Sequence, residues 1–196
     1  MWFESIRLEN GHFFRLSYHQ QRMDSTIATC TGKGNSVRLE DVLRKTPYPH
    51  WGLFKCRVVY NHRAVVQVEF LPYRHHRPDW LCVVRNDSIT YAYKFTDRSG
   101  LEKLKPARPG TDALIIRNGL VTDALYSNLL FYTGNRWLTP AQPLLKGTMR
   151  QVLLDAGEIE EEDIHEKDIR KFSLVKRINA MLQFDEPALP VARIIW

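Results

Sequence analysis

The sequence contains few cysteines, and their positions favour neither a disulfide framework nor a zinc site. Only three occur in 196 residues, Cys30, Cys56 and Cys82, and no two have Cys-x-x-Cys spacing. An odd number of separated thiols is typical of reduced cysteines in a cytosolic protein. His75 and His76 adjoin each other but have no third ligand at metal-binding spacing, so we expect no metal site.

The sequence also lacks a long apolar run. It has no stretch of about eighteen apolar residues that could span a membrane, and its first ten residues include charges where a signal peptide has an apolar core. These absences predict a cytoplasmic protein. The Gly-x-Gly-x-x-Gly and Gly-x-x-x-x-Gly-Lys-Ser/Thr loops are missing as well, which argues against the common nucleotide-binding folds.

The basic residues are not clustered in the way that nucleic-acid binding requires. The formal net charge is +6, yet bases and acids are interspersed and the densest basic stretch is Arg74–Arg77. A nucleic-acid module places its basic residues along one stripe. The modest positive charge suits a small anionic ligand instead, and we expect neither nucleic acid nor a membrane as a partner.

Strands and helices are predicted in both halves of the chain, in runs and not in strict alternation, which favours an α+β fold. The periodicity lapses around residues 73–78, where the sequence reads Tyr-Arg-His-His-Arg-Pro. We interpret this stretch as a linker between an N-terminal α/β lobe, residues 1–76, and a C-terminal β-rich lobe, residues 77–196. The second lobe would then carry Lys94.

In the first lobe, Asn10-Gly11 predicts the turn of a β-hairpin, because both residues tolerate positive φ. Ser17 is the expected N-cap of a helix at 18–30. The other elements expected in this lobe are a helix at 36–44 and strands at 52–60 and 64–72. The second lobe is expected to contain strands at 80–85, 112–117, 129–133, 137–139 and 191–196, a helix at 148–156, an exposed acidic segment at 158–163 and a helix or strand at 169–181.

Two residues have surroundings that suit cofactor chemistry. Lys94 lies within Tyr91–Phe95, where aromatic neighbours would lower its pKa if the amine were buried, and Schiff-base chemistry requires a neutral amine. Asp123 precedes Ser127-Asn128 and an apolar strand, and a carboxylate there could keep a pyridinium nitrogen protonated. Taken alone, a lysine among aromatic rings is more often a surface residue, and such an aspartate more often caps a turn.

Two further patterns could bind a phosphate. Lys146–Arg150 opens a helix with Gly147, and the first N–H groups of that helix could receive an anion. His19 and Arg22 lie at positions i and i+3 of one helix face, and the guanidinium could bind a phosphate with two hydrogen bonds. In isolation, an ordinary glycine-containing helix start and an exposed arginine are the commoner structures.

Six ordered blocks of the sequence together resemble the class IV, or fold-type IV, pyridoxal-phosphate enzymes. This family includes branched-chain and D-amino-acid aminotransferases and 4-amino-4-deoxychorismate lyase. The blocks that carry the resemblance are Phe3–Arg7 (F-E-[ST]-[IL]-R), Leu16–Met23 (L-x-x-H-x-x-R-[LM]), Lys94–Arg98 (K-x-x-x-R), Asp112–Leu114 with Val121–Leu129 (T-E-x-x-x-[ST]-N-[LI]), Leu138–Pro140 with Gly147–Gln151 (L-x-T-P and G-[IV]-[TM]-R), and Ile178–Met181 (C-N-A-L).

The resemblance implies a two-lobed fold-type IV enzyme with pyridoxal 5'-phosphate as its cofactor. Lys94 would form the Schiff base and carry protons, Asp123 would contact the ring nitrogen, and Arg22, Asn179 and the helix start at 148–149 would bind the phosphate. A homodimer and a small anionic amino substrate are also implied. The cofactor-binding residues implied in this way are Arg22, Lys94, Asp123, Ser127, Asn128, Thr148, Met149 and Asn179.

Within the family, the Lys94–Arg98 and Ile178–Met181 blocks favour the lyase, which would release pyruvate from 4-amino-4-deoxychorismate and give 4-aminobenzoate. An aminotransferase acting on D- or branched-chain amino acids is the alternative, and it would need a site for a keto acid. Two departures motivate a third hypothesis, a protein that binds the cofactor without turnover. Asp123 stands where the family has a glutamate, and the segment that usually precedes Phe3 is missing.

Overall fold

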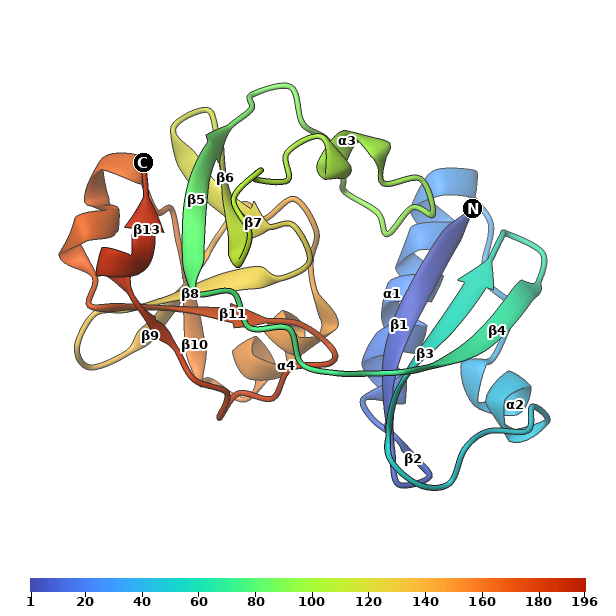
Figure 1. Cartoon of the computed structure of the whole chain (residues 1–196). Coiled ribbons are helices and arrows are strands. Elements are labelled where there is room, and N and C mark those ends of the chain that lie inside the picture. Colours follow the sequence, from blue (N-terminus) through green and yellow to red (C-terminus); the bar gives the residue numbers. More distant parts are fainter. The chain divides into compact units, whose positions relative to one another are not determined.

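The computed structural model describes residues 1–196 and has the α+β fold class that the sequence predicts (Figure 1). Backbone contacts divide the chain into two compact units. The first unit consists of Met1–His75 and Tyr93–Asp97, and the second consists of His76–Ala92 and Arg98–Trp196. No helix is long and apolar enough to cross a membrane.

The first unit has a four-stranded antiparallel sheet with the order β2-β1-β3-β4. The turn between β1 and β2 contains Asn10 at φ 47° and Gly11 at φ 80°, so the predicted hairpin is confirmed. The elements of this unit are β1 (Trp2–Glu9), β2 (His12–Phe13), α1 (Leu16–Thr31), α2 (Leu39–Arg44), β3 (Leu53–Tyr60) and β4 (Val65–Pro72).

Helix α1 packs on this sheet through one buried face. His19, Met23, Thr26 and Ile27 form that face, since residues three and four apart lie on the same side of a helix. The predicted N-cap is wrong, because α1 begins at Leu16, after Arg15 in the left-handed region, and Ser17 therefore lies inside its first turn. The predicted end is correct, because Gly32 closes the helix at φ 68°.

The segment Tyr93–Asp97 belongs to the first unit, which differs from the expectation that the C-terminal lobe carries Lys94. The reason is backbone pairing along β1. Phe3 N–H donates to Lys94 O at 2.9 Å, and Thr96 N–H donates to Met1 O at 3.1 Å. The first half of β1 has no partner in β2, so this side of the strand is open to the later segment.

The second unit has a mixed nine-stranded sheet with the order β10-β9-β8-β7-β6-β5-β13. Outside this order, β11 pairs with β8, and β12 pairs with β11. Its helical elements are α3 (Ser99–Glu102), α4 (Thr148–Asp155) and the 3-10 helices η1 (Glu166–Lys171) and η2 (Val191–Arg193). Its strands are β5 (Trp80–Arg85), β6 (Thr111–Arg117), β7 (Leu120–Ala124), β8 (Asn128–Tyr132), β9 (Trp137–Pro140), β10 (Ile159–Glu162), β11 (Leu174–Ile178), β12 (Leu189–Pro190) and β13 (Ile194–Ile195).

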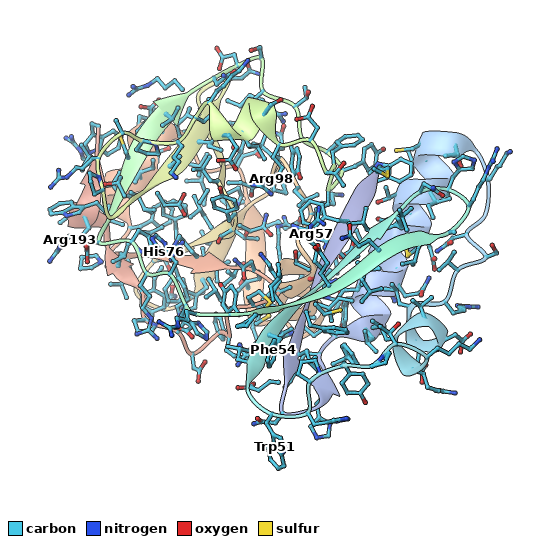
Figure 2. The ribbon with its side chains drawn as sticks, turned by 45° about the vertical axis from the view of Figure 1, so that its right-hand side comes forward. Trp51, Phe54, Arg57, His76, Arg98 and Arg193 are labelled. Carbon is cyan, nitrogen blue, oxygen red and sulfur yellow. The ribbon has the colours of Figure 1, made fainter.

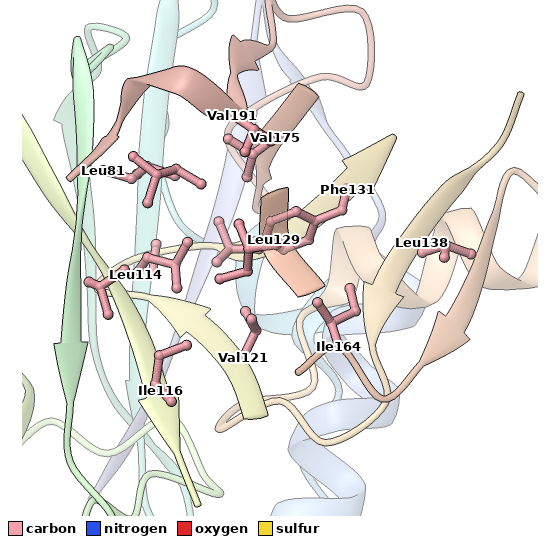
Figure 3. Packing of buried hydrophobic residues seen from close by; sticks show 14 residues of the cluster. Leu81, Leu114, Ile116, Val121, Leu129, Phe131, Leu138, Ile164, Val175 and Val191 are labelled. Carbon is pink, nitrogen blue, oxygen red and sulfur yellow. The ribbon is translucent and has the colours of Figure 1, made fainter. Parts of the chain in front are cut away.

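Aliphatic side chains from most of these strands form the main core of the second unit (Figure 3). Leu114 and Leu129 are fully buried at its centre, with Phe131 beside them. Burying each such side chain contributes about 1.5–3 kcal/mol. This core therefore holds β6, β7 and β8 rigidly, and the ends of those strands carry the predicted cofactor residues.

The sequence did not predict β7, α3 or β12, and three further segments of the second unit differ in detail from the prediction. The acidic segment at 158–163 contains β10, which pairs in parallel with β9 and leaves its glutamates exposed. The segment at 169–181 contains part of η1 and then β11, so a 3-10 helix and a strand replace a single element. The last strand is only two residues long, because η2 occupies the start of the predicted range.

Candidate active site

Glu4 lies at the centre of a buried charged cluster in the first unit. The alternation of β1 places it between Trp2 and Ile6 on the face that packs against α1. His19 Nδ1 is 2.6 Å from one Glu4 oxygen, and Arg22 donates to both oxygens, from Nε at 3.0 Å and from a terminal nitrogen. The prediction that His19 and Arg22 share one helix face is confirmed, because both reach the same carboxylate.

The charges of this cluster fix its protonation. Burial opposes ionisation of Glu4, but the charge of Arg22 and the hydrogen bond from His19 outweigh it and lower the pKa of Glu4 to about 2. Burial lowers the pKa of His19, with smaller opposing contributions from Glu4. A neutral His19 therefore donates its Nδ1 hydrogen to the carboxylate, which leaves the buried Nε2 as an acceptor without a hydrogen-bond partner.

Lys94 is half-buried and shares an aromatic ring with a second cation. Its Nζ lies 4.8 Å from the centre of the Phe3 ring, and the Arg57 guanidinium lies 5.0 Å from the same point. Phe3 points to the opposite face of the sheet from Glu4, because neighbouring strand residues alternate. Arg57, labelled in Figure 2, also pairs with Glu69 at 3.0 Å. The sequence did not indicate Arg57 as a neighbour of the lysine's aromatic contact.

In the second unit, Asp123 and Asn128 form a buried polar pair at the adjoining ends of β7 and β8. Asn128 Nδ2 donates to Asp123 Oδ1 at 2.7 Å and to Leu145 O at 2.7 Å. Leu145 N–H donates to Asp123 Oδ2 at 2.9 Å. Burial raises the pKa of Asp123 to about 7, and these hydrogen bonds and the charge of Arg150 offset it only in part. The carboxyl group thus has neutral donors as its direct partners.

The start of α4 lies directly against this polar pair. A Cβ at Gly147 would lie 2.0 Å from Asn128 Oδ1, so only glycine fits here, although its φ of −74° is ordinary. No side chain caps the first turn of α4. Thr148 is buried, and its hydroxyl has no hydrogen-bond partner. The Met149 side chain packs into the core with Leu153, so only its backbone is free to take part in a site.

Asn179 and Ser127 extend the same group of residues. Asn179 Nδ2 donates to Ser127 Oγ at 3.2 Å and to Tyr126 O at 3.1 Å, and its oxygen accepts from the N–H groups of Met181 and Leu182. This hydrogen bonding holds the turn between β7 and β8 against the segment that follows β11. Asn179 is therefore tied into the protein through both ends of its amide.

The predicted site residues fall into two groups, each within one unit. Arg22 and Lys94 lie in the first unit. The second unit brings together Asp123, Ser127, Asn128, Thr148, Met149 and Asn179 through the contacts described above. Sequence reasoning missed the contribution of Glu4 as the partner of Arg22. A signal was present, since a glutamate between Trp2 and Ile6 on the apolar face of a strand must be paired to be stable.

Comparison with known proteins identifies the family of the chain. Residues 103–193 match the family model for amino-transferase class IV. An uncharacterized protein of Haemophilus influenzae is 36% identical over 183 residues, which are 91% of this chain and 96% of that relative. The crystal structure of a protein from Haemophilus somnus, named "putative 4-amino-4-deoxychorismate lyase", is 34% identical with a TM-score of 0.85, and the match covers 92% of this chain and 95% of that one.

More distant structures share the fold. A hypothetical aminotransferase from Mycobacterium tuberculosis, in its PLP-bound form, has a TM-score of 0.76 at 16% identity, over 98% of this chain and 80% of that one. The chain belongs to the class IV aminotransferase family, whose members are pyridoxal-phosphate-dependent enzymes. The family predicted from the six sequence blocks, and its α+β fold, are thereby confirmed.

Proposed function

We propose that this chain binds pyridoxal 5'-phosphate through Lys94 and acts as a 4-amino-4-deoxychorismate lyase, releasing pyruvate and 4-aminobenzoate. The observation that carries the choice of reaction is the 34% identity, over nearly the whole chain, to the Haemophilus somnus protein of that name. A 47-residue match, 45% identical, to a "putative aminodeoxychorismate lyase" of Schizosaccharomyces pombe supports the same choice. The cytoplasmic location and the homodimer stay predictions from the sequence.

The polar groups of the second unit fit such a cofactor. Thr148 has a buried hydroxyl without a partner at an uncapped helix start, where backbone N–H groups attract a phosphate. Asp123 is a buried carboxyl group that no cation contacts directly, and it can accept further hydrogen bonds beyond those from Asn128 and Leu145. A protonated ring nitrogen is the kind of cation that this carboxyl group lacks.

Each proposed residue then has a definite task. Arg22, Asn179 and the first turn of α4 would bind the phosphate, and Asp123 would hold the ring nitrogen protonated. Pyridoxal phosphate, when bound, supplies an electron-withdrawing ring that stabilises negative charge at the substrate carbon. Lys94 would hold the cofactor covalently, and its freed amine would then remove the proton from the carbon that bears the substrate nitrogen.

The first unit prepares the two cations for these tasks. Glu4 holds the Arg22 guanidinium by two hydrogen bonds, so the side chain loses little freedom when it binds an anion. The Phe3 ring shields one side of the Lys94 amine. These contacts hold Arg22 and cover one side of Lys94 before any ligand binds.

The lyase can be distinguished from an aminotransferase by its need for an acceptor. We expect the purified protein to release pyruvate from 4-amino-4-deoxychorismate without any added keto acid. Strict dependence on a keto-acid acceptor would support the aminotransferase alternative. The family match and the aminotransferase structures of the same fold are the reason for testing it. Cofactor binding with no product from 4-amino-4-deoxychorismate or from D- or branched-chain amino acids would support the hypothesis of a protein without turnover.

Lys94→Ala tests the covalent role directly. We expect it to abolish the visible absorption band of the lysine-bound cofactor and to lower turnover by about 10²–10⁴-fold, the usual contribution of a proton-transferring group. Lys105→Ala is the matched control, because Lys105 is an exposed lysine outside the predicted site. Borohydride reduction followed by peptide mapping should place the label on Lys94, and a label on another lysine would contradict the assignment.

A further inference from the structure

Arg98, the last residue of the Lys94–Arg98 block, makes an unusual set of contacts within the second unit (Figure 2). Its guanidinium lies 4.5 Å from the centre of the Tyr126 ring and 5.4 Å from that of Tyr91. One terminal nitrogen donates to Leu125 O at 2.7 Å. The Nε is buried without a hydrogen-bond partner and lies 3.8 Å from a Glu102 oxygen.

These contacts join three points of the chain that matter for the site. Tyr91 lies just before the segment Tyr93–Asp97, which leaves the second unit, and Arg98 is the first residue after that segment. Leu125 and Tyr126 form the turn between Asp123 and Asn128. Arg98 therefore clamps both ends of the lysine-bearing segment to each other and to the turn that presents the buried carboxyl group.

The clamp limits where Lys94 can lie. Lys94 is three residues after Tyr91 and four before Arg98, so the chain allows its Cα to move at most about 11 Å from one and about 14 Å from the other. If Tyr91 and Arg98 were not held together, the short segment could shift as a whole. With both ends held together, the segment that carries Lys94 forms a short closed loop, and its backbone can adopt fewer conformations.

We infer that Arg98 is a positioning residue for Lys94, acting through the rings of Tyr91 and Tyr126 and the carbonyl oxygen of Leu125. The inference rests on the proposed role of Lys94 in binding the cofactor. A planar guanidinium can lie against two rings while donating a hydrogen bond in its plane, which an ammonium group cannot do. Arg98→Lys is therefore expected to keep the positive charge but to lose the contacts with the two rings and the Leu125 carbonyl oxygen.

The spectroscopic and kinetic test uses the holoenzyme. In Arg98→Ala we expect kcat to fall about 10- to 100-fold with a smaller change in KM, because a misplaced catalytic group loses rate more than binding. The pH midpoint of the cofactor absorption band should move as well, and Arg98→Lys should recover little of either effect. Tyr126→Phe, which keeps the ring and loses the hydrogen bond to Glu102, should resemble the wild type, whereas Tyr126→Ala should resemble Arg98→Ala.

Hydrogen exchange of the chain without cofactor gives a readout that does not need activity. We expect faster amide exchange at 92–98 and 123–127 in Arg98→Ala, and no change there in Arg136→Ala, which removes only an exposed ion pair with Glu160. If Arg98→Ala proves unfolded, Tyr126→Ala carries the test. Unchanged exchange, or faster exchange with unchanged kcat and band midpoint, would overturn the inference. A wild-type protein without any cofactor band would instead refute the proposed function, and the exchange result would still report on the clamp.

Discussion

Glu4 and Asp123 are both buried carboxyl groups, one in each unit. Their surroundings shift their pKa values in opposite directions. Glu4 lies against Arg22 and His19, and its pKa falls to about 2. Asp123 receives hydrogen bonds from the amide of Asn128 and the backbone of Leu145, and burial raises its pKa to about 7. Burial alone disfavours charge at both sites. The difference lies in the hydrogen-bond and ion-pair partners. Glu4 has a cationic partner within its own unit, whereas the direct partners of Asp123 are neutral.

This difference separates a structural carboxylate from a carboxyl group suited to a ligand. The charge of Glu4 holds Arg22 in place, and its removal would take away this buried ion pair. The raised pKa of Asp123 shows that its ionised form is destabilised by burial, and a bound cation would stabilise that form. Thr148, in the same unit as Asp123, has a buried hydroxyl that lacks a hydrogen-bond partner.

The largest expected effect comes from neutralising Glu4. Glu4→Gln should lower the free energy of unfolding by about 3–5 kcal/mol, because the buried Arg22 contact loses its counter-charge. Urea denaturation of the chain measures this. Glu40→Gln is the matched control in the same unit: Glu40 pairs with Arg44 at the exposed surface of α2, and its loss should cost no more than about 1 kcal/mol. Equal losses in the two variants would show that burial of the Glu4 ion pair adds nothing to its effect on stability.

A second effect is the pH dependence of stability without cofactor. Burial raises the pKa of Asp123 from 3.8 to about 7. Its contribution to the free energy of unfolding is therefore fully present below pH 3.8 and is lost as the pH rises through about 7. The slope at its steepest is about 1.4 kcal/mol per pH unit. The pKa of Glu4 is lowered from 4.5 to about 2, so Glu4 affects stability in the opposite direction. Its contribution to the free energy of unfolding is present above pH 4.5 and is lost as the pH falls towards 2.

Denaturation curves between pH 4 and 8 test this prediction. Asp123→Asn should remove the loss of stability between pH 4 and 7, although it also disturbs the donors on Asn128 and Leu145 at a cost of about 1–3 kcal/mol. Saturating pyridoxal phosphate should flatten the same slope in the wild type. A wild-type curve that is already flat over this range would show that Asp123 is ionised without a ligand.

The smallest effect concerns the Thr148 hydroxyl. Thr148→Val should leave the stability of the cofactor-free chain unchanged or slightly higher, because it replaces a buried hydroxyl that has no partner. Its affinity for pyridoxal phosphate should fall about 10- to 100-fold, as expected for one hydrogen bond to a charged group. Thr148→Ser should bind like the wild type in a fluorescence titration. A stability loss without any change in affinity would show that the hydroxyl serves only the fold.

Local sequence patterns predict the strands and turns of this protein well. β5 lies at Trp80–Arg85 as predicted, because an apolar run there is bounded by polar residues and a proline. The turn at Asn118-Gly119 adopts positive φ at both residues, as such pairs favour. The start of α4 at Thr148 follows from the glycine before it. These features depend on neighbouring residues, and the sequence therefore contains their cause.

Contacts between distant residues explain what the sequence could not predict. Asp123 meets the backbone of Leu145, 22 positions away, and no periodicity encodes that approach. Tyr93–Asp97 joins the first unit because β1 leaves part of one side unpaired, a fact that appears only when β2 is known to be two residues long. The family resemblance gave roles to Lys94 and Arg22. It included Glu4 and Arg98 in its sequence blocks but did not indicate which residues they contact.

β10 has a consequence for how the protein behaves at high concentration. It forms one border of the nine-stranded sheet, and its three glutamates are exposed. A border strand offers unpaired backbone groups to another molecule, and charged side chains along such a strand oppose its pairing with a second copy. Glu160 and Glu161 carry their charges in ion pairs with Arg136 and Arg150. Intermolecular sheet growth is thus discouraged in neutral buffer.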